Sequence, residues 1–148
     1  MGTSVPEEPR WAPDSAPAEQ SLWRWACEQL PDHVLVLPQV MMTVTGKGRP
    51  QEAEADLVLV DPSHGVTVVE VKGGEISYDT SRQWERSVRG ERRDVRDPVA
   101  QVKRTRGVLR DALKQRNVDV ATLPIRWAVA TPDCRLDAPG VPILPASQ

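Results

Sequence analysis

Residues 54–74 read EADLVLVDPSHGVTVVEVKGG, and this stretch decides the fold. Two runs rich in β-branched residues, Glu54–Asp61 and Val66–Lys72, flank the segment DPSHG. Pro62 and Gly65 are typical turn residues, so the pattern predicts a β-hairpin. The middle of each run is apolar at consecutive positions, which is typical of strands in a sheet that is covered on both faces.

The register of this hairpin brings acidic residues together at the end away from the turn. If Val60 faces Val66, Asp56 lies opposite Glu70. Side chains alternate along a strand, so the two carboxylates then share one face of the sheet. A slip by one residue would separate them, so the candidate site depends on this register.

The charged end of that face has the composition of a metal site. In the same register Glu54 lies opposite Lys72, which adds an acid and an ammonium group to Asp56 and Glu70. Two carboxylates that face each other in a half-buried sheet repel, and each raises the pKa of the other unless a cation lies between them. Oxygen ligands suit Mg²⁺ or Mn²⁺, so Asp56 and Glu70 are the candidate metal ligands. Lys72 can orient a water molecule or neutralise charge on a phosphate, which points to metal-assisted phosphodiester hydrolysis.

The same residues resemble a known family. An Asp on one strand, a tight hairpin and Glu-x-Lys on the next strand are similar to the core of the nuclease-related (NERD) domain of the PD-(D/E)xK nuclease superfamily. The resemblance extends over most of residues 17–130. It implies a restriction-endonuclease-like α/β fold and a Mg²⁺- or Mn²⁺-dependent nuclease that acts on DNA. It also implies that the matching residues Asp56, Glu70 and Lys72 are catalytic.

Two positions outside the hairpin match the family pattern as well. Glu19, in PAEQSLWRW, matches a Glu that the first helix of the family commonly supplies. Gln101, in DPVAQ, matches a polar residue near the start of a later helix, so the resemblance adds both residues to the catalytic set. The chain departs from the pattern at Ala55, which replaces a Pro, and at Thr105, which replaces a Tyr.

Periodicity and capping residues predict the elements outside the hairpin. Asp97 and Pro98 are typical of the N-cap and the first position of a helix. Pro38 interrupts an apolar run, which favours an edge strand or a bulge there. The order α-β-β-β-α-β predicts a mixed α/β fold with a central sheet. The elements are a helix over about 16–30 that starts at Ser15 and Pro17, a strand over 34–44, the hairpin, a short strand around Trp84, a charged loop over 89–96, a helix from Asp97 to about Gln115 and a strand over 125–130.

Composition sets the domain limits and the compartment. Residues 1–14 are polar and rich in proline, which predicts a disordered lead, and residues 15–148 form the expected NERD-like domain. No stretch reaches the roughly 18 apolar residues of a membrane span, and the N-terminus lacks a secretory signal, so a cytoplasmic protein is expected. Cys27 and Cys134 lack the paired spacing of a zinc site and are expected to be reduced thiols.

Charge is distributed unevenly along the chain. Residues 82–116 contain 12 basic and 5 acidic side chains, whereas residues 1–81 contain 5 basic and 13 acidic ones. A basic segment beside an acidic site attracts a polyanion such as a nucleic acid. The resemblance also implies a helicase or another domain as a partner, because NERD-like domains can be joined to such domains. The residues predicted to contact nucleic acid are Arg92, Arg93, Arg96, Lys103 and Arg104.

Two other interpretations fit the same residues. A catalytically silent module of NERD fold would bind or target nucleic acid with a steep salt dependence and without metal-dependent turnover. A structural α/β domain would use Asp56 to begin a strand and would carry Glu70 and Lys72 as an exposed ion pair. Glu19 in the first turn of a helix interacts favourably with the helix dipole in any case, and Gln101 near a helix start can be solvated.

Overall fold

The hairpin predicted from residues 54–74 forms the middle of the central sheet. The structure, a computed structural model, describes residues 1–13, 17–46, 48–79, 81, 83–136, 138 and 140–144. Within these ranges the elements in chain order are β1 (Thr3–Ser4), α1 (Pro17–Gln29), β2 (Leu35–Val44), β3 (Gln51–Asp61), β4 (Gly65–Val71), β5 (Glu75–Tyr78), β6 (Trp84–Val88), β7 (Glu91–Asp94), α2 (Pro98–Gln115), β8 (Ile125–Ala130) and β9 (Ile143–Leu144).

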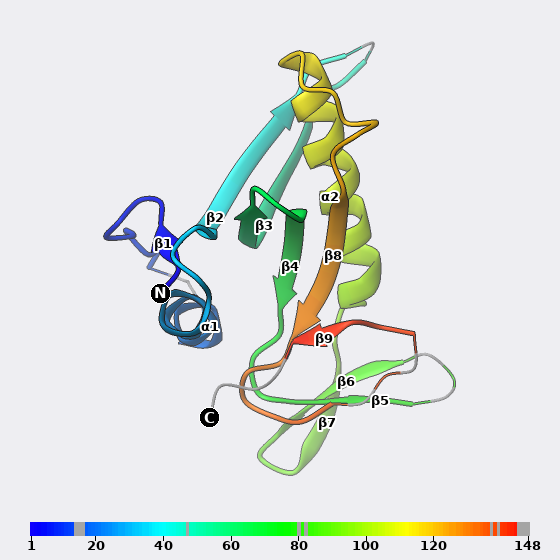
Figure 1. The fold of residues 1–148 in the computed structure, drawn as a ribbon. Coiled ribbons are helices and arrows are strands. Elements are labelled where there is room, and N and C mark those ends of the chain that lie inside the picture. Colours follow the sequence, from blue (N-terminus) through cyan, green and yellow to red (C-terminus); the bar gives the residue numbers. More distant parts are fainter. Residues whose placement is uncertain are drawn as a thin grey trace.

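The central sheet has mixed strand directions. Its order within the described residues is β1-β2-β3-β4-β8-β9. Strands β2, β3 and β4 are antiparallel neighbours, and β4 pairs with β8 in parallel. Figure 1 shows α1 and α2 on different sides of this sheet and the small sheet β5-β6-β7 below it. The arrangement confirms the predicted mixed α/β fold and is consistent with a restriction-endonuclease-like fold.

The predicted hairpin register is confirmed at the turn end. Val60 pairs with Val66, and the ladder extends from Asp61–Gly65 to Leu57–Val69. Gly65 has a φ of 104°, and a Cβ atom there would lie 2.4 Å from the carbonyl oxygen of Pro124, so only glycine fits this position.

Both faces of β3 and β4 are buried, as their continuous apolar runs predict. On one face, sheet residues such as Val58 and Val68 pack with Val102 and Val108 of α2. On the other face, neighbouring sheet residues pack with α1. The cluster on the α1 face consists of Ala18, Leu22, Ala26, Val36, Leu57, Val69, Val71 and Ala130. Two helices therefore enclose the sheet and hold β3 and β4 between them.

The predicted start of α2 is confirmed. The Asp97 carboxylate accepts hydrogen bonds from the backbone N–H groups of Val99 at 2.8 Å and Ala100 at 3.2 Å, and Pro98 occupies the first turn. The cap fixes the end of α2 nearest the predicted site. Helix α1 matches its predicted extent to within a residue, and Ser15, expected at its start, lies outside the described residues.

The second sheet differs from the expectation of one short strand and a charged loop. β5, β6 and β7 form an antiparallel meander, and β7 occupies part of the predicted loop over 89–96. Its four residues, ERRD, are all exposed, so they show no apolar alternation. The turn before β7 has positive φ at Arg89 (51°) and Gly90 (80°), which matches the twist of a tight hairpin.

The N-terminal segment, expected to be a disordered lead, makes defined contacts in the structure. β1 pairs in parallel with Leu35 and Val36 of β2. The indole N–H of Trp23 donates to the Ser4 hydroxyl at 2.9 Å, and Trp11 packs edge-on against Trp23. Polar backbone groups of the segment therefore complete the exposed start of β2, which composition alone could not indicate.

Candidate functional site

The candidate site lies where β3 and β4 separate. Their ladder ends at Leu57–Val69, beyond which β3 pairs with β2 and β4 pairs with β8. The Asp56 carboxylate takes the place of the next ladder bond, because its Oδ2 accepts the N–H of Val71 at 2.8 Å. The backbone N–H of Lys72 donates to Ala130 on the β8 side instead. The strands diverge, and carboxylates line the opening.

The alternation of side chains between the two faces of the sheet changes in β3 at Asp56. Ala53 and Ala55 pack on the α2 face, as does Val58, whereas Leu57 packs on the α1 face. A regular strand would keep residues 53, 55 and 57 on one face. The alternation therefore changes between Ala55 and Leu57, and the expectation that Glu54, Asp56 and Val58 share one regular face is wrong.

β2 has a matching irregularity opposite Asp56. Gln39 has a φ of 52°, and the flanking pairs are Pro38–Leu57 and Val40–Ala55. Both strands are therefore irregular at the same level of the sheet. The sequence anticipated an edge or bulge at Pro38, and β1 pairs with β2 only at Leu35 and Val36, so β2 is an edge at this point among the described residues. The predicted Glu54–Lys72 pair is not formed, because the β3–β4 ladder stops before it.

Glu70 and Lys72 form a largely buried ion pair. The Lys72 Nζ lies 3.5 Å from Glu70 Oε1, and the side chains are 13% and 11% exposed. The interpretation of an exposed ion pair is therefore wrong. Removing two charged groups from water is costly unless further polar groups compensate, so this pair is a candidate for function.

Both carboxyl groups of the site hold protons more tightly than usual. Burial raises the pKa of Glu70 to about 7, and the Asp56 charge adds to this effect while Lys72 opposes it. Burial also raises the pKa of Asp56, against the hydrogen bond from Val71 and the charge of Lys72. The Glu70 side chain offsets part of the rise in the Asp56 pKa, so the two acids influence each other's protonation.

A cavity of about 470 Å³ brings the predicted residues together. Glu19 reaches it from α1, Asp56 and Glu70 from the sheet, and Gln101 from α2. Lys72 does not line the cavity and joins the cluster through Glu70. The remaining lining residues are Ala12, Glu52, Ala53, Glu54, Arg96, Arg104 and Thr105.

Gln101 has an unsatisfied acceptor in this cavity. Its side-chain Oε1 is buried and has no hydrogen-bond partner among the described residues. A buried polar atom without a partner costs free energy, so such an atom in a cleft indicates a position for a ligand or an ordered water molecule. Thr105 contributes nothing to this oxygen, because its hydroxyl donates to the backbone carbonyl of Gln101 at 2.9 Å.

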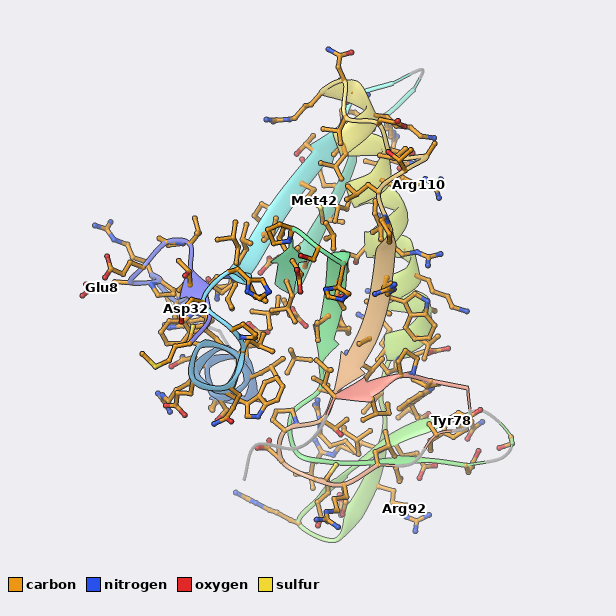
Figure 2. All side chains as sticks on the ribbon, viewed as in Figure 1. Glu8, Asp32, Met42, Tyr78, Arg92 and Arg110 are labelled. Atoms are coloured by element: carbon orange, nitrogen blue, oxygen red, sulfur yellow. The ribbon has the colours of Figure 1, made fainter. Side chains whose placement is uncertain are left out.

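The predicted basic residues divide into two groups. Arg96 and Arg104 line the cavity, and Arg104 also donates to the backbone carbonyl of Glu52 at 3.2 Å. Arg92 and Arg93 lie on β7 outside the cavity, and Figure 2 shows Arg92 at the edge of the small sheet. Lys103 also lies outside it, with its Nζ 5.2 Å from the centroid of the Trp127 ring.

Sequence reasoning did not place Glu52 in the site, and it placed Glu54 at the charged end of the hairpin without making it a metal ligand. Both are exposed residues at the rim of the cavity. Their exposure explains the miss, since acidic residues at the start of a strand are common and carry no distinct signal. They add negative charge beside Asp56, and Glu54 contributes to the raised Asp56 pKa.

The donor set fits Mg²⁺ or Mn²⁺ better than a metal that needs a complete protein cage. No group of three or more His, Cys, Asp or Glu side chains in the described parts of the chain is arranged to hold a metal ion. Mg²⁺ is commonly bound by one or two carboxylates and keeps several water molecules, which matches Asp56 and Glu70. The free Oε1 of Gln101 can accept a hydrogen bond from such a water molecule.

Comparison with known proteins gives one match. The nuclease-related domain (NERD) family profile matches residues 15–131. No curated protein sequence and no solved structure matches the chain. Among the described residues, neither helix is long and apolar enough to cross a membrane.

Proposed function

The chain belongs to the nuclease-related domain (NERD) family, and from this premise we propose that it is a nuclease that hydrolyses phosphodiester bonds in DNA with Mg²⁺ or Mn²⁺. One observation carries the proposal most directly. Two carboxyl groups with raised pKa values, the half-buried Asp56 and the buried Glu70, converge beside the Lys72 ammonium at the edge of an open cavity. A divalent cation between them would relieve their repulsion.

The residues of the cavity and the adjacent Lys72 have distinct roles in this reaction. Asp56 and Glu70 would hold the metal ion, which would supply polarisation of the phosphate and activation of water. Lys72, held 3.5 Å from Glu70, orients the attacking water or offsets charge on the phosphate. Gln101 accepts a hydrogen bond from a water molecule through its unpartnered Oε1.

The outer residues of the cavity bind the substrate and complete the site. Arg96 and Arg104 flank the acids, where guanidinium groups can bind the phosphates on either side of the cleaved bond. Glu19 approaches from α1 and adds a carboxylate to the cavity. We further propose a cytoplasmic setting, on the composition of the chain, and a helicase or another domain as a partner, on the family resemblance.

Cleavage of plasmid DNA tests the proposal. Supercoiled plasmid is incubated with the protein and Mg²⁺ or Mn²⁺, and the wild type is compared with Asp56→Ala and Lys72→Ala. We expect nicking by the wild type and its loss in both variants. Glu28→Ala is the matched control, because Glu28 is an exposed acid on α1 outside the cavity, and it should cleave as the wild type does.

Metal binding by calorimetry separates chemistry from folding. The wild type should bind Mn²⁺ and release protons, since Glu70 is partly protonated near pH 7. Asp56→Ala should lose this heat while its circular dichroism stays unchanged. Equal nicking in all four proteins would refute the assignment. DNA binding without metal-dependent turnover would instead support the catalytically silent module.

A further inference from the structure

Two cavities lie along α2 on the side of the helix away from the candidate active site. They have volumes of about 400 and 420 Å³, and both include Lys103 in their walls. We call the combined feature the α2 groove, lined by Tyr78, Trp84, Lys103, Arg106, Arg110 and the segment 120–125. With 3.6 residues per turn, the stripe 103–106–110 lies on roughly the opposite side of the helix from Gln101, Arg104 and Thr105. The two features are therefore separate surfaces.

One end of the α2 groove is positively charged. Lys103, Arg106 and Arg110 line it, and none of them forms an ion pair with another described residue. The only acidic residue in the α2 sequence, Asp111, does not line the groove. Lys103 lies over the Trp127 ring, and cations in a row without an acidic partner among the described residues are suited to successive phosphate groups.

The other end of the groove is aromatic. The rings of Tyr78 and Trp84 lie 4.9 Å apart between centroids, and Trp84 is only 4% exposed. The buried Trp84 supports Tyr78, which is half-buried and lines the cavity. Asp97 lies here too, but its carboxylate is engaged in capping α2. Figure 2 shows Tyr78 and Arg110 near opposite ends of α2 on the same side of the view.

The geometry points to a binding site for single-stranded nucleic acid in the α2 groove, with phosphates on Lys103, Arg106 and Arg110 and an unpaired base against Tyr78. A basic groove that ends in an aromatic platform is how proteins hold single strands without reading sequence. A base pair in a duplex keeps its faces stacked and cannot reach such a ring. The inference rests on the proposed function for its choice of nucleic acid as the ligand, and it deepens that function by naming a substrate with a single-stranded segment.

Fluorescence anisotropy with a labelled oligothymidine tests this site. Binding is measured in EDTA, so that no cleavage occurs, and an unlabelled duplex of equal length serves as competitor. Arg110→Glu should weaken single-strand binding on the order of tenfold and reduce the slope of log affinity against log salt by about 0.7 or more. Tyr78→Leu should weaken it on the order of tenfold with the salt slope unchanged, because stacking does not depend on counterions.

Two control variants make the test specific. Arg24→Glu reverses one exposed charge on α1, outside the groove, and Tyr78→Phe keeps the ring. Both should bind within about twofold of the wild type. Circular dichroism and unfolding midpoints establish that each variant is folded. If Tyr78→Leu unfolds, Tyr78→Phe still tests the stacking role. Lost binding by Tyr78→Phe would overturn that role.

Each outcome decides the inference. Loss confined to Arg110→Glu and Tyr78→Leu supports it. Wild-type affinity in Arg110→Glu, or an equal loss in Arg24→Glu, overturns it. An equal loss of duplex affinity in Tyr78→Leu overturns the assignment to single strands. Groove-dependent binding without any metal-dependent cleavage would support the inference and refute the proposed function, whereas cleavage without groove-dependent binding would do the reverse.

Discussion

The two ends of the β3–β4 pair use the same strands for opposite purposes. At the turn end, from Asp61–Gly65 to Leu57–Val69, the backbone ladder is complete and the side chains are largely apolar. At the other end the ladder stops, and Asp56 accepts the backbone N–H of Val71 in its place. We refer to these as the closed end and the open end of the hairpin.

The difference teaches how a sheet can hold buried charges. At the open end the backbone N–H of Val71 donates to the Asp56 carboxylate, and that of Lys72 donates to Ala130 of β8. This leaves room between the strands for the cavity, and the closed end holds the strands in register. The proposed function thus depends on the local end of the β3–β4 ladder, which the apolar core at the closed end stabilises.

Removing one charge at the open end should have the largest effect. Asp56→Asn keeps an oxygen that can accept the Val71 N–H, so the fold should be retained. Because a metal ligand contributes several kcal/mol to catalysis, DNA cleavage should fall roughly 1000-fold. The measurement is single-turnover cleavage of labelled DNA with Mn²⁺.

Asp61→Asn at the closed end is the matched control for this change. Asp61 accepts the backbone N–H of Ser63 at 2.8 Å in the turn and does not line the cavity. We expect cleavage close to that of the wild type. A similar loss in both variants would mean that general charge, rather than the open end, controls activity.

A cavity created at the closed end should lower the stability of the fold and leave DNA cleavage largely unchanged. Leu57 is 2% exposed and packs against α1, so Leu57→Ala should lower the free energy of unfolding by about 2–5 kcal/mol. Urea denaturation measures this value, and Met41→Ala, at a side chain 68% exposed, should change it by no more than about 0.5 kcal/mol. If folded Leu57→Ala lost cleavage as completely as Asp56→Asn, the two ends would not be separable.

The closed end was predictable from sequence, and the open end only in part. The β-branched runs, Pro62 and Gly65 determine the register, and with it the approach of Asp56 to Glu70. The separation of the strands was not predictable, because it depends on how β2 and β8 hold the outer edges of β3 and β4. Pairing of that kind is decided by tertiary context and leaves no local pattern.

Other differences have similar causes. Helix α2 was predictable because Asp97 and Pro98 are strong start signals. β7 was not, because all its side chains are exposed and its turn uses Arg89 at positive φ. The meeting of Glu19 and Gln101 in one cavity came from the family resemblance, since no spacing in the sequence relates α1 to α2.

The open end should also make stability depend on pH. The pKa of Glu70 is raised to about 7 in the folded protein, so the folded state binds a proton that the unfolded chain releases near its ordinary value. This contribution is full below the ordinary pKa of Glu and is lost as the pH rises through 7. Without divalent metal, the unfolding free energy should therefore fall by on the order of 2–3 kcal/mol from pH 4.5 to pH 8.

Glu70→Gln isolates this contribution. The variant cannot ionise at this position, so in EDTA at pH 8 it should be more stable than the wild type and should have a flatter pH profile. Mn²⁺ should restore stability to the wild type at pH 8 and leave the variant almost unchanged. Urea denaturation at several pH values measures both effects, and parallel profiles for the two proteins would exclude Glu70 as the titrating group.

The smallest expected effect tests the irregularity in β2 and β3 that separates the closed end of the hairpin from the open end. Gln39 lies opposite Asp56 with a φ of 52°, a conformation that β-branched residues adopt only with strain. Gln39→Val should lower the unfolding free energy by about 1–2 kcal/mol, whereas Gln39→Gly should change it by less than about 1 kcal/mol. Because the irregularity in β2 holds Asp56 in place, Gln39→Val should also weaken Mn²⁺ binding while Gln39→Gly retains it. Calorimetry measures the affinity, and unchanged binding in Gln39→Val would show that the closed end and α2 position Asp56 without help from β2.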